Sequence, residues 1–350
     1  IMNSRERFIA TVERKPVDRP ACWLGDPTPE AVPALCEYYH VNDIKELKKE
    51  CGDDFYAVEI PYKSPTCSAI FAAFDWYMNG SNVDTEHRTL TADGCFAHCE
   101  DLEDIEAVNF QWPDPEKYID PELCRKLVDE APDDKVVMGM LWACHFQDTC
   151  AAFGMQTCLM NMVAEPEMVH YVDDHIVDFY VKALKIFLEA TKGKVQAILI
   201  GDDVGSQRGL MISPELIKEF VIPGAKKLID LAHSYGVKVV YHSCGSIVEA
   251  IPLLIEAGVD VVHPIQALAA GMDPANLKSK FDGQISFCGG VDTQDLLPNG
   301  TPEQVAAKVK ELRTYFPTGL IVSPSHEGLQ PDVPPSNIKA LFDEATKIYE

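Results

Sequence analysis

The chain has few of the features that mark several large classes of protein. Lysine and arginine number 30 against 55 aspartates and glutamates, giving a formal net charge of −25. That balance disfavours nucleic acid or an anionic membrane surface as a partner. The longest apolar runs, such as 136–144, fall well short of the roughly 18 residues of a membrane span. The sequence therefore predicts a protein that binds neither nucleic acid nor a membrane.

Cysteine pairs with a zinc-binding spacing are also missing. The twelve cysteines are scattered, with no CxxC and no zinc-ribbon spacing, which favours reduced thiols in a cytoplasmic protein. Residues 1–7 are charged and lack the apolar core of a signal peptide. No linker rich in Gly, Ser or Pro divides the chain, so we expect one domain over 1–350. The acidic composition is compatible with a monomer or a homodimer.

Segments of strand character alternate with segments of helical periodicity along most of the chain. The apolar run 135–142 is typical of a strand buried on both faces, and 166–192 carries an unbroken helical stripe. A doubly wound open sheet is the second choice, because no glycine-rich dinucleotide turn follows an early strand. The fold class predicted is α/β, a single (β/α)8 TIM barrel. Its eight strands are expected to end near Asp26, Ile60, Trp142, Ile200, Tyr241, His263, Cys288 and Ser323.

An N-terminal elaboration of helices and a hairpin is expected beside the barrel. The irregular stretch 62–98 is interpreted as an insertion over one end of the domain, with a hairpin over 89–99. Three later segments, 150–164, 213–235 and 246–257, are each predicted to be one continuous helix.

Two metal-binding residue types stand at the end of the fifth strand. His242 and Cys244 are two residues apart, so their side chains should point to the same place beyond the strand. Gly245 then lets the backbone turn. A nitrogen and a sulfur donor in that position suit zinc. The alternative is a packed and hydrogen-bonded pair without metal.

The other strand ends supply further candidates, because all of them face one mouth in such a barrel. His326, after the last strand, would complete three zinc ligands and leave a fourth position open. A loop histidine that only forms hydrogen bonds is the equal alternative, and Cys288 or an acidic residue is the reserve ligand. The full set at the strand ends is Asp26, Glu59, His145 with Gln147, Asp202 with Asp203, His242 with Cys244, His263 with Gln266, Cys288 with Asp292, and His326 with Glu327.

Adjacent carboxylates at a buried mouth repel one another and need donors. Only one of Asp202 and Asp203 can face inward. That one is a candidate general base, metal ligand or partner of a cationic group, and the alternative is a cap or a salt bridge to Arg208. His145 is a further catalytic candidate. The residues predicted to bind a cofactor are Trp142, His263, Gln266 and Asp292.

Several motifs together carry a family resemblance. The chain resembles the uroporphyrinogen decarboxylase superfamily over essentially its whole length, which implies a (β/α)8 barrel. The superfamily contains decarboxylases and cobamide-dependent methyltransferases. The matching motifs are Arg5-Glu6-Arg7-Phe8, Pro16-Val17-Asp18-Arg19-Pro20, Gly201-Asp202-Asp203, His242-Ser243-Cys244-Gly245, Gly289-Gly290-Val291-Asp292 and Pro334-Pro335-Ser336-Asn337-Ile338.

The resemblance favours the methyltransferase branch. True uroporphyrinogen decarboxylases carry an arginine-rich loop after the first strand, and 22–30 contains no arginine. The methyltransferases hold zinc by His-x-Cys and a later Cys, and His242-Ser243-Cys244 matches the first element. His326 stands where the second Cys is expected.

This branch implies zinc, a corrinoid (cobalamin) co-substrate and a corrinoid protein as partner, with a small thiol or folate-type methyl donor or acceptor. A decarboxylase of a small or tetrapyrrole carboxylate, and a non-catalytic corrinoid or tetrapyrrole binder, are the alternatives.

Overall fold

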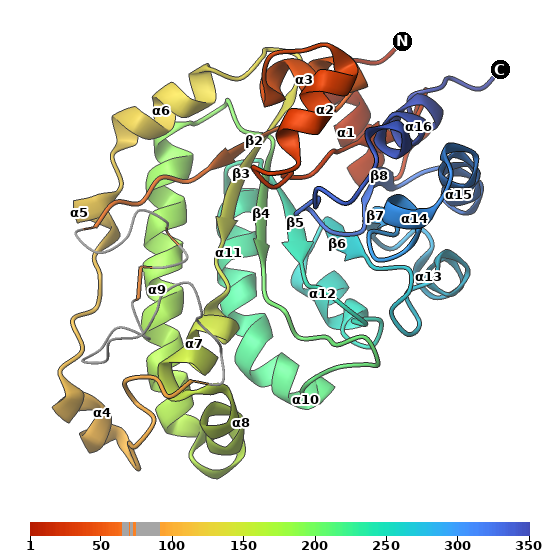
Figure 1. Cartoon of the computed structure of the whole chain (residues 1–350). Helices are drawn as coiled ribbons and strands as arrows, with labels where there is room; N and C mark the ends of the chain where they lie inside the picture. The colour runs from red at the N-terminus through yellow and green to blue at the C-terminus, as the bar shows by residue number, and fades with distance from the viewer. Residues whose placement is uncertain (65–69, 71–72, 75–91) are drawn as a thin grey trace.

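The computed structural model of the chain describes residues 1–64, 70, 73–74 and 92–350. Within these residues, eight parallel strands form one nearly closed barrel with helices between them (Figure 1). Their order around the sheet is β1-β8-β7-β6-β5-β4-β3-β2. This confirms the α/β class and the TIM barrel. The strands are β1 (Ala21–Cys22), β2 (Phe55–Glu59), β3 (Val136–Trp142), β4 (Ala197–Gly201), β5 (Lys238–His242), β6 (Val261–Ile265), β7 (Ser286–Val291) and β8 (Leu320–Pro324).

Helices cover the outside of the barrel, and the two termini lie close together (Figure 1). None of the helices in the described ranges is long and apolar enough to cross a membrane. The helical elements are α1 (Ser4–Val12), α2 (Val32–Tyr39), α3 (Ile44–Cys51), α4 (Leu102–Val108), α5 (Pro115–Tyr118), α6 (Pro121–Asp129), α7 (His145–Phe153), α8 (Met155–Ala164), α9 (Pro166–Ala190), α10 (Pro214–Leu216), the π-helical turn η3 (Ile217–Val221), α11 (Ile222–Ser234), α12 (Ile251–Ala257), α13 (Pro274–Phe281), α14 (Leu296–Asn299), α15 (Pro302–Tyr315) and α16 (Pro335–Ala345).

Three predicted helices differ from the structure. Gly154 has a left-handed φ of +86°, which ends α7 before α8 begins, and a Cβ there would lie 3.0 Å from a backbone oxygen. The π turn η3 divides 213–235. The segment 246–250 is not helical, since Ser246 pairs with Ser206 instead. The hairpin predicted over 89–99 lies partly outside the described residues, and its described part, 92–99, contains turn and no strand.

Side chains along each strand alternate between the barrel interior and the helical layer. On β5, Val240 belongs to the interior apolar cluster and Tyr241 to the cluster under the helices. Trp23, directly after β1, also belongs to the interior cluster. His242, two residues after Val240, is therefore directed to the interior at the open end of the barrel.

The first strand is shorter than predicted, and β1 does not pair with β2. Two buried carboxylates bridge this seam in place of a ladder. Asp54 donates its N–H to the Cys22 carbonyl at 3.0 Å and accepts the Cys22 N–H on its side chain at 2.8 Å. Asp53 accepts the Leu24 N–H at 3.0 Å. Side-chain oxygens thus close the ring where strand pairing stops.

The negative charge at the seam is fully compensated. Asp54, with no exposed surface, lies 2.8 Å from the Arg7 guanidinium and 2.9 Å from that of Arg19. Ser4 donates a further hydrogen bond to it at 2.7 Å. The N-terminal motifs that carry the family resemblance therefore have a structural role here.

Candidate metal centre

The end of β5 brings a nitrogen and a sulfur donor together. His242 Nε2 lies 3.3 Å from Cys244 Sγ, so the two side chains converge as their spacing predicts. Gly245 follows with φ +82°, and a Cβ there would lie 2.7 Å from the Ser206 carbonyl oxygen. Only glycine allows this close approach of the two loops.

Asp203, after β4, adds a carboxylate to this pair. Its Oδ1 accepts the Cys244 N–H at 2.8 Å and lies 3.6 Å from His242 Nε2. The three candidate ligand atoms lie within 4.8 Å of one another. One imidazole, one thiol and one carboxylate are a donor set that suits zinc, with a fourth tetrahedral position left for substrate or water.

The other nitrogen of the His242 ring faces a second group. His242 Nδ1 lies 3.0 Å from His263 Nδ1 and 3.6 Å from Glu327 Oε2. His263 is completely buried, and burial together with the neighbouring His242 and His326 keeps its pKa well below the usual value. His263 is therefore neutral. His242, His263 and Glu327 also offer ligand atoms within 4.8 Å.

Several buried polar atoms at this end of the barrel have no hydrogen-bond partner in the part of the chain that the structure describes. They are Trp23 Nε1, His263 Nε2 and Glu327 Oε2. Buried polar groups are normally satisfied, so a cluster of unsatisfied ones calls for an explanation. The residues present thus fit a site that binds a metal and a polar ligand.

Asp202 points away from this site. Its two oxygens accept the N–H groups of Phe146 and Gln147, both at 3.0 Å, and it is completely buried. Burial raises its pKa to about 7. Gln147 in turn accepts the Asp203 N–H at 3.0 Å. Asp202 therefore fixes the loop that holds Asp203.

His145 lies behind the barrel wall. Its Nδ1 is 2.7 Å from Asp173 Oδ1, its Nε2 is 3.1 Å from the Val221 carbonyl oxygen, and Asp202 lies 3.5 Å away. Both ring nitrogens thus face acceptors. Burial alone would lower the pKa of His145, but Asp173 and Asp202 outweigh it and raise the pKa to about 9. The structure does not bring this charged histidine to the His242 cluster.

His326 lies beside the two candidate ligand groups and belongs to neither. Its Nδ1 accepts the Gly328 N–H at 3.0 Å, and its Nε2 is 3.7 Å from Glu327 Oε1. The ring centroids of His326 and His242 are 6.3 Å apart. Asp203 is the residue whose carboxylate lies next to Cys244, and the ligand role of His326 stays a prediction.

Two residues predicted to bind a cofactor each support a loop in the structure. Gln266 accepts the Gly245 N–H and so supports the turn after Cys244. Asp292 accepts the N–H groups of residues 294, 295 and 296 after β7. Both side chains are committed to the backbone.

Trp142 reaches the site through an irregularity in β3. The register against β4 shifts between Met140 and Trp142, and Trp142 has φ +62°. Its ring lies 5.4 Å from the His242 ring, and its N–H donates to Glu59 at 3.2 Å. The Glu59 residue is exposed at the mouth, but protein atoms around its carboxyl group partly remove it from water, and this desolvation raises its pKa to about 7.

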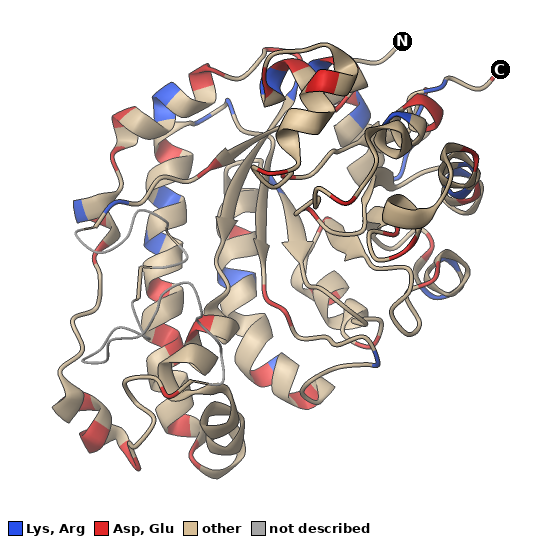
Figure 2. Ribbon diagram, viewed as in Figure 1, with Lys and Arg blue, Asp and Glu red and all other residues tan. Residues whose placement is uncertain are grey.

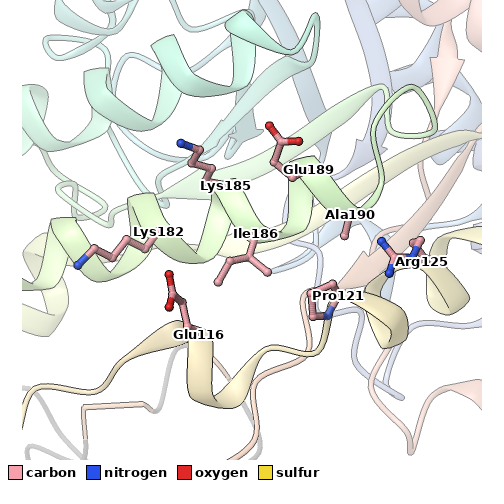
Figure 3. A pocket seen from close by; sticks show the side chains of 8 residues that line it. All are labelled: Glu116, Pro121, Arg125, Lys182, Lys185, Ile186, Glu189 and Ala190. Carbon is pink, nitrogen blue, oxygen red and sulfur yellow. The ribbon is translucent and has the colours of Figure 1, made fainter.

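A separate cavity of about 460 Å³ lies on the outer face, between α5, α6 and α9 (Figure 3). Its walls carry both signs of charge, including Glu116, Lys182 and Glu189. None of the residues at the barrel mouth lines it. The chemistry described above therefore does not involve this cavity.

The sequence model of the family described as "Uroporphyrinogen decarboxylase (URO-D)" matches residues 3–348. A methylated-thiol–coenzyme M methyltransferase of Methanosarcina mazei is 29% identical over 150 residues, 42% of this chain and 36% of the relative. The methylcobamide:CoM methyltransferase MtbA of the same organism is 24% identical over 152 residues, 43% of this chain and 42% of that protein. The matches thus span less than half the length of these relatives.

Among solved structures, a methyltransferase from Methanosarcina mazei superposes with a TM-score of 0.69. The superposition covers 99% of each chain at 17% sequence identity. At that identity the likeness shows the fold alone.

Proposed function

The chain belongs to the uroporphyrinogen decarboxylase family, and on that premise we propose that it is a corrinoid-dependent methyltransferase. It would move a methyl group between a corrinoid carried by a partner protein and a small acceptor such as a thiol or a folate. The names of the two partial relatives support this reaction. The convergence of His242, Cys244 and Asp203 at the barrel mouth is the observation that carries it.

Zinc would be held by His242 Nε2, Cys244 Sγ and an Asp203 oxygen. His326 is the alternative third ligand. When bound, zinc acts as a Lewis acid that lowers the pKa of a coordinated thiol and so supplies a thiolate near neutral pH. The open fourth position is where substrate would enter.

The residues around these three orient them. Glu327 and His263 face the free nitrogen of His242, the position at which metal-bound histidines usually meet a carboxylate or another acceptor. Trp142 forms a wall beside the ring. Asp202 and His145 act at a distance, as positioning residues for the loop that contacts Asp203.

A matched pair of cysteine variants tests the proposal. Wild type and Cys99→Ser should bind stoichiometric zinc, and Cys244→Ser should lose it. Methyl transfer from methylcobalamin to a thiol should fall by about 100-fold or more in Cys244→Ser, since a metal ligand is removed. Equal zinc content and equal transfer in all three proteins would contradict the proposal.

A decarboxylase is the second candidate, because the family model itself bears that name. The acidic residues at the mouth and the absence of arginine from 22–30 argue against a polycarboxylate substrate. Release of CO₂ from a candidate acid without any corrinoid would favour the decarboxylase. Tight corrinoid or tetrapyrrole binding without turnover would favour a carrier.

A further inference from the structure

The barrel mouth concentrates negative charge. Asp26, Glu59, Asp203 and Glu327 come from four different strand ends. Within the described part of the chain, none of them forms an ion pair with a lysine or arginine. Lys48 approaches this region but donates to the Gly25 carbonyl and lies 3.4 Å from Asp53. Figure 2 shows basic residues mostly on the outer helices.

The Trp142 ring is placed against these charges at a conformational cost. Both Trp142 and Ala143 have positive φ, +62° and +53°. Non-glycine residues with left-handed backbone angles are strained, and such strain persists at sites where it serves function. The result is an indole whose N–H reaches Glu59 and whose ring lies beside His242. An aromatic surface next to a carboxylate is the arrangement that recognises organic cations.

Two fully buried groups on the Glu327 side of the mouth independently indicate a ligand, because His263 lies close to Glu327 and Trp23 lies against His263. Trp23 is 1% exposed and His263 is 0% exposed, yet Trp23 Nε1 and His263 Nε2 have no hydrogen-bond partner among the described residues. Their rings lie 5.1 Å apart on the interior side of the barrel. Trp23 Nε1 can donate to a polar ligand atom or an ordered water bound there, and His263 Nε2 can donate to it or accept from it according to the ring tautomer.

We propose that the small substrate of this site carries a cationic ammonium head group, bound by the Trp142 ring and the carboxylates of Glu59, Glu327 and Asp26. The reacting atom, a thiol sulfur in the simplest case, would lie at the open position beside His242, Cys244 and Asp203. This inference rests on the proposed function for the metal and the thiol, but the charge preference comes from other residues. An anionic head group would be repelled by these carboxylates.

Three thiols that differ only in their tails test the preference. Calorimetry on the zinc-loaded protein at pH 8 would compare 2-aminoethanethiol, 2-mercaptoethanol and 2-mercaptoethanesulfonate, which are cationic, neutral and anionic. We expect affinity to fall in that order, with about tenfold or more between first and last, because like charges at this range repel appreciably. Sulfonate binding as tight as that of the neutral thiol, or equal binding of the cationic and neutral thiols, would overturn the proposal.

A second arm needs neither metal nor thiol. The chain has four tryptophans, so ¹⁵N-labelled indoles give four signals, and Trp142→Phe identifies the signal of Trp142. Ethanolamine should shift that signal at lower concentration than ethylene glycol, and isethionate should not shift it. Equal shifts by all three compounds would count against the cation site.

Variants separate this inference from the metal proposal. Glu59→Gln should reduce the preference for the cationic compounds in both arms, whereas the exposed control Glu219→Gln should leave it unchanged. If no thiol binds but ethanolamine still shifts the Trp142 signal, the metal proposal fails and the cation site stands. If the thiols bind without a charge order, the reverse holds.

Discussion

The seam between β1 and β2 and the mouth around His242 both bury acidic side chains, but they treat them differently. At the seam, Asp54 is in contact with two guanidinium groups, a hydroxyl and a backbone N–H. At the mouth, Glu327 Oε2 and His263 Nε2 are buried and have no hydrogen-bond partner among the described residues. Buried charge whose partners are all internal holds a fold together, whereas unsatisfied polar groups at an opening indicate that something else binds.

The same contrast separates two adjacent residues. Both carboxylate oxygens of Asp202 accept hydrogen bonds from the backbone of 146–147, whereas Asp203 faces His242 and Cys244. Neutralising an acid of the first kind should therefore change stability, and neutralising one of the second kind should change ligand binding.

The largest effect is expected at the seam. Asp54→Asn leaves Arg19 without its counter-charge and Arg7 with Asp18 alone, so the free energy of unfolding should fall by about 3–5 kcal/mol. Urea denaturation measures it. Zinc content of the folded fraction should not change. Asp343→Asn, at an exposed pair with Lys339, should cost less than about 0.5 kcal/mol. If Asp54→Asn lowered the free energy of unfolding as little as this control, Asp54 would not be the stabilising counter-charge of the seam.

The charged histidine behind the wall should give a pH-dependent effect. The folded pKa of His145 is raised to about 9 from 6.5, so its contribution is full below pH 6.5 and is lost as pH rises through 9. His145→Gln should cost about 2–4 kcal/mol at pH 7 and clearly less above pH 9.5. Urea midpoints at the two pH values test this.

Two controls isolate that window. Asp202 has a folded pKa raised to about 7 from 3.8. Its titration therefore lowers the free energy of unfolding as pH rises through that range, and this change is complete before pH 9. His170→Gln, at an exposed pair with Glu219, should change the free energy of unfolding by the same small amount at pH 7 and at pH 9.5. A His145 variant with the same cost at both pH values would show that the ring is not charged.

A substitution at the mouth should change ligand binding rather than stability. Glu327→Gln removes the carboxylate that faces His242 Nδ1, and zinc affinity measured by chelator competition should weaken by about 10–100-fold. Its free energy of unfolding without metal should stay within about 0.5 kcal/mol of wild type. Complete loss of zinc would instead place the metal among His242, His263 and Glu327.

The barrel was predictable from the sequence because period and strand count are local properties. The apolar run 135–142 and the spacing of His242 and Cys244 each correspond to the structure. The short β1 was not predictable, because Asp53 and Asp54 replace its ladder through contacts distant in sequence. The break at Gly154 likewise depends on a contact with the loop at 92.

The site was predictable only in part. Strand alternation showed that one of Asp202 and Asp203 faces inward but could not select it, since that depends on where β4 ends. His326 was preferred over Asp203 as third ligand because sequence gives residue types, not distances. Glu327 was recognised only as one polar residue among many at the strand ends. Its significance lies in an unsatisfied oxygen, which only the three-dimensional structure shows.

X-ray absorption at the zinc edge tests the central claim most directly. For the zinc-loaded protein we expect one sulfur ligand at about 2.3 Å and nitrogen or oxygen ligands at about 2.0–2.2 Å. The spectrum should be unchanged in His326→Ala, and the metal should be lost in Asp203→Ala. A spectrum without sulfur, or retention of zinc in Asp203→Ala with loss in His326→Ala, would contradict it.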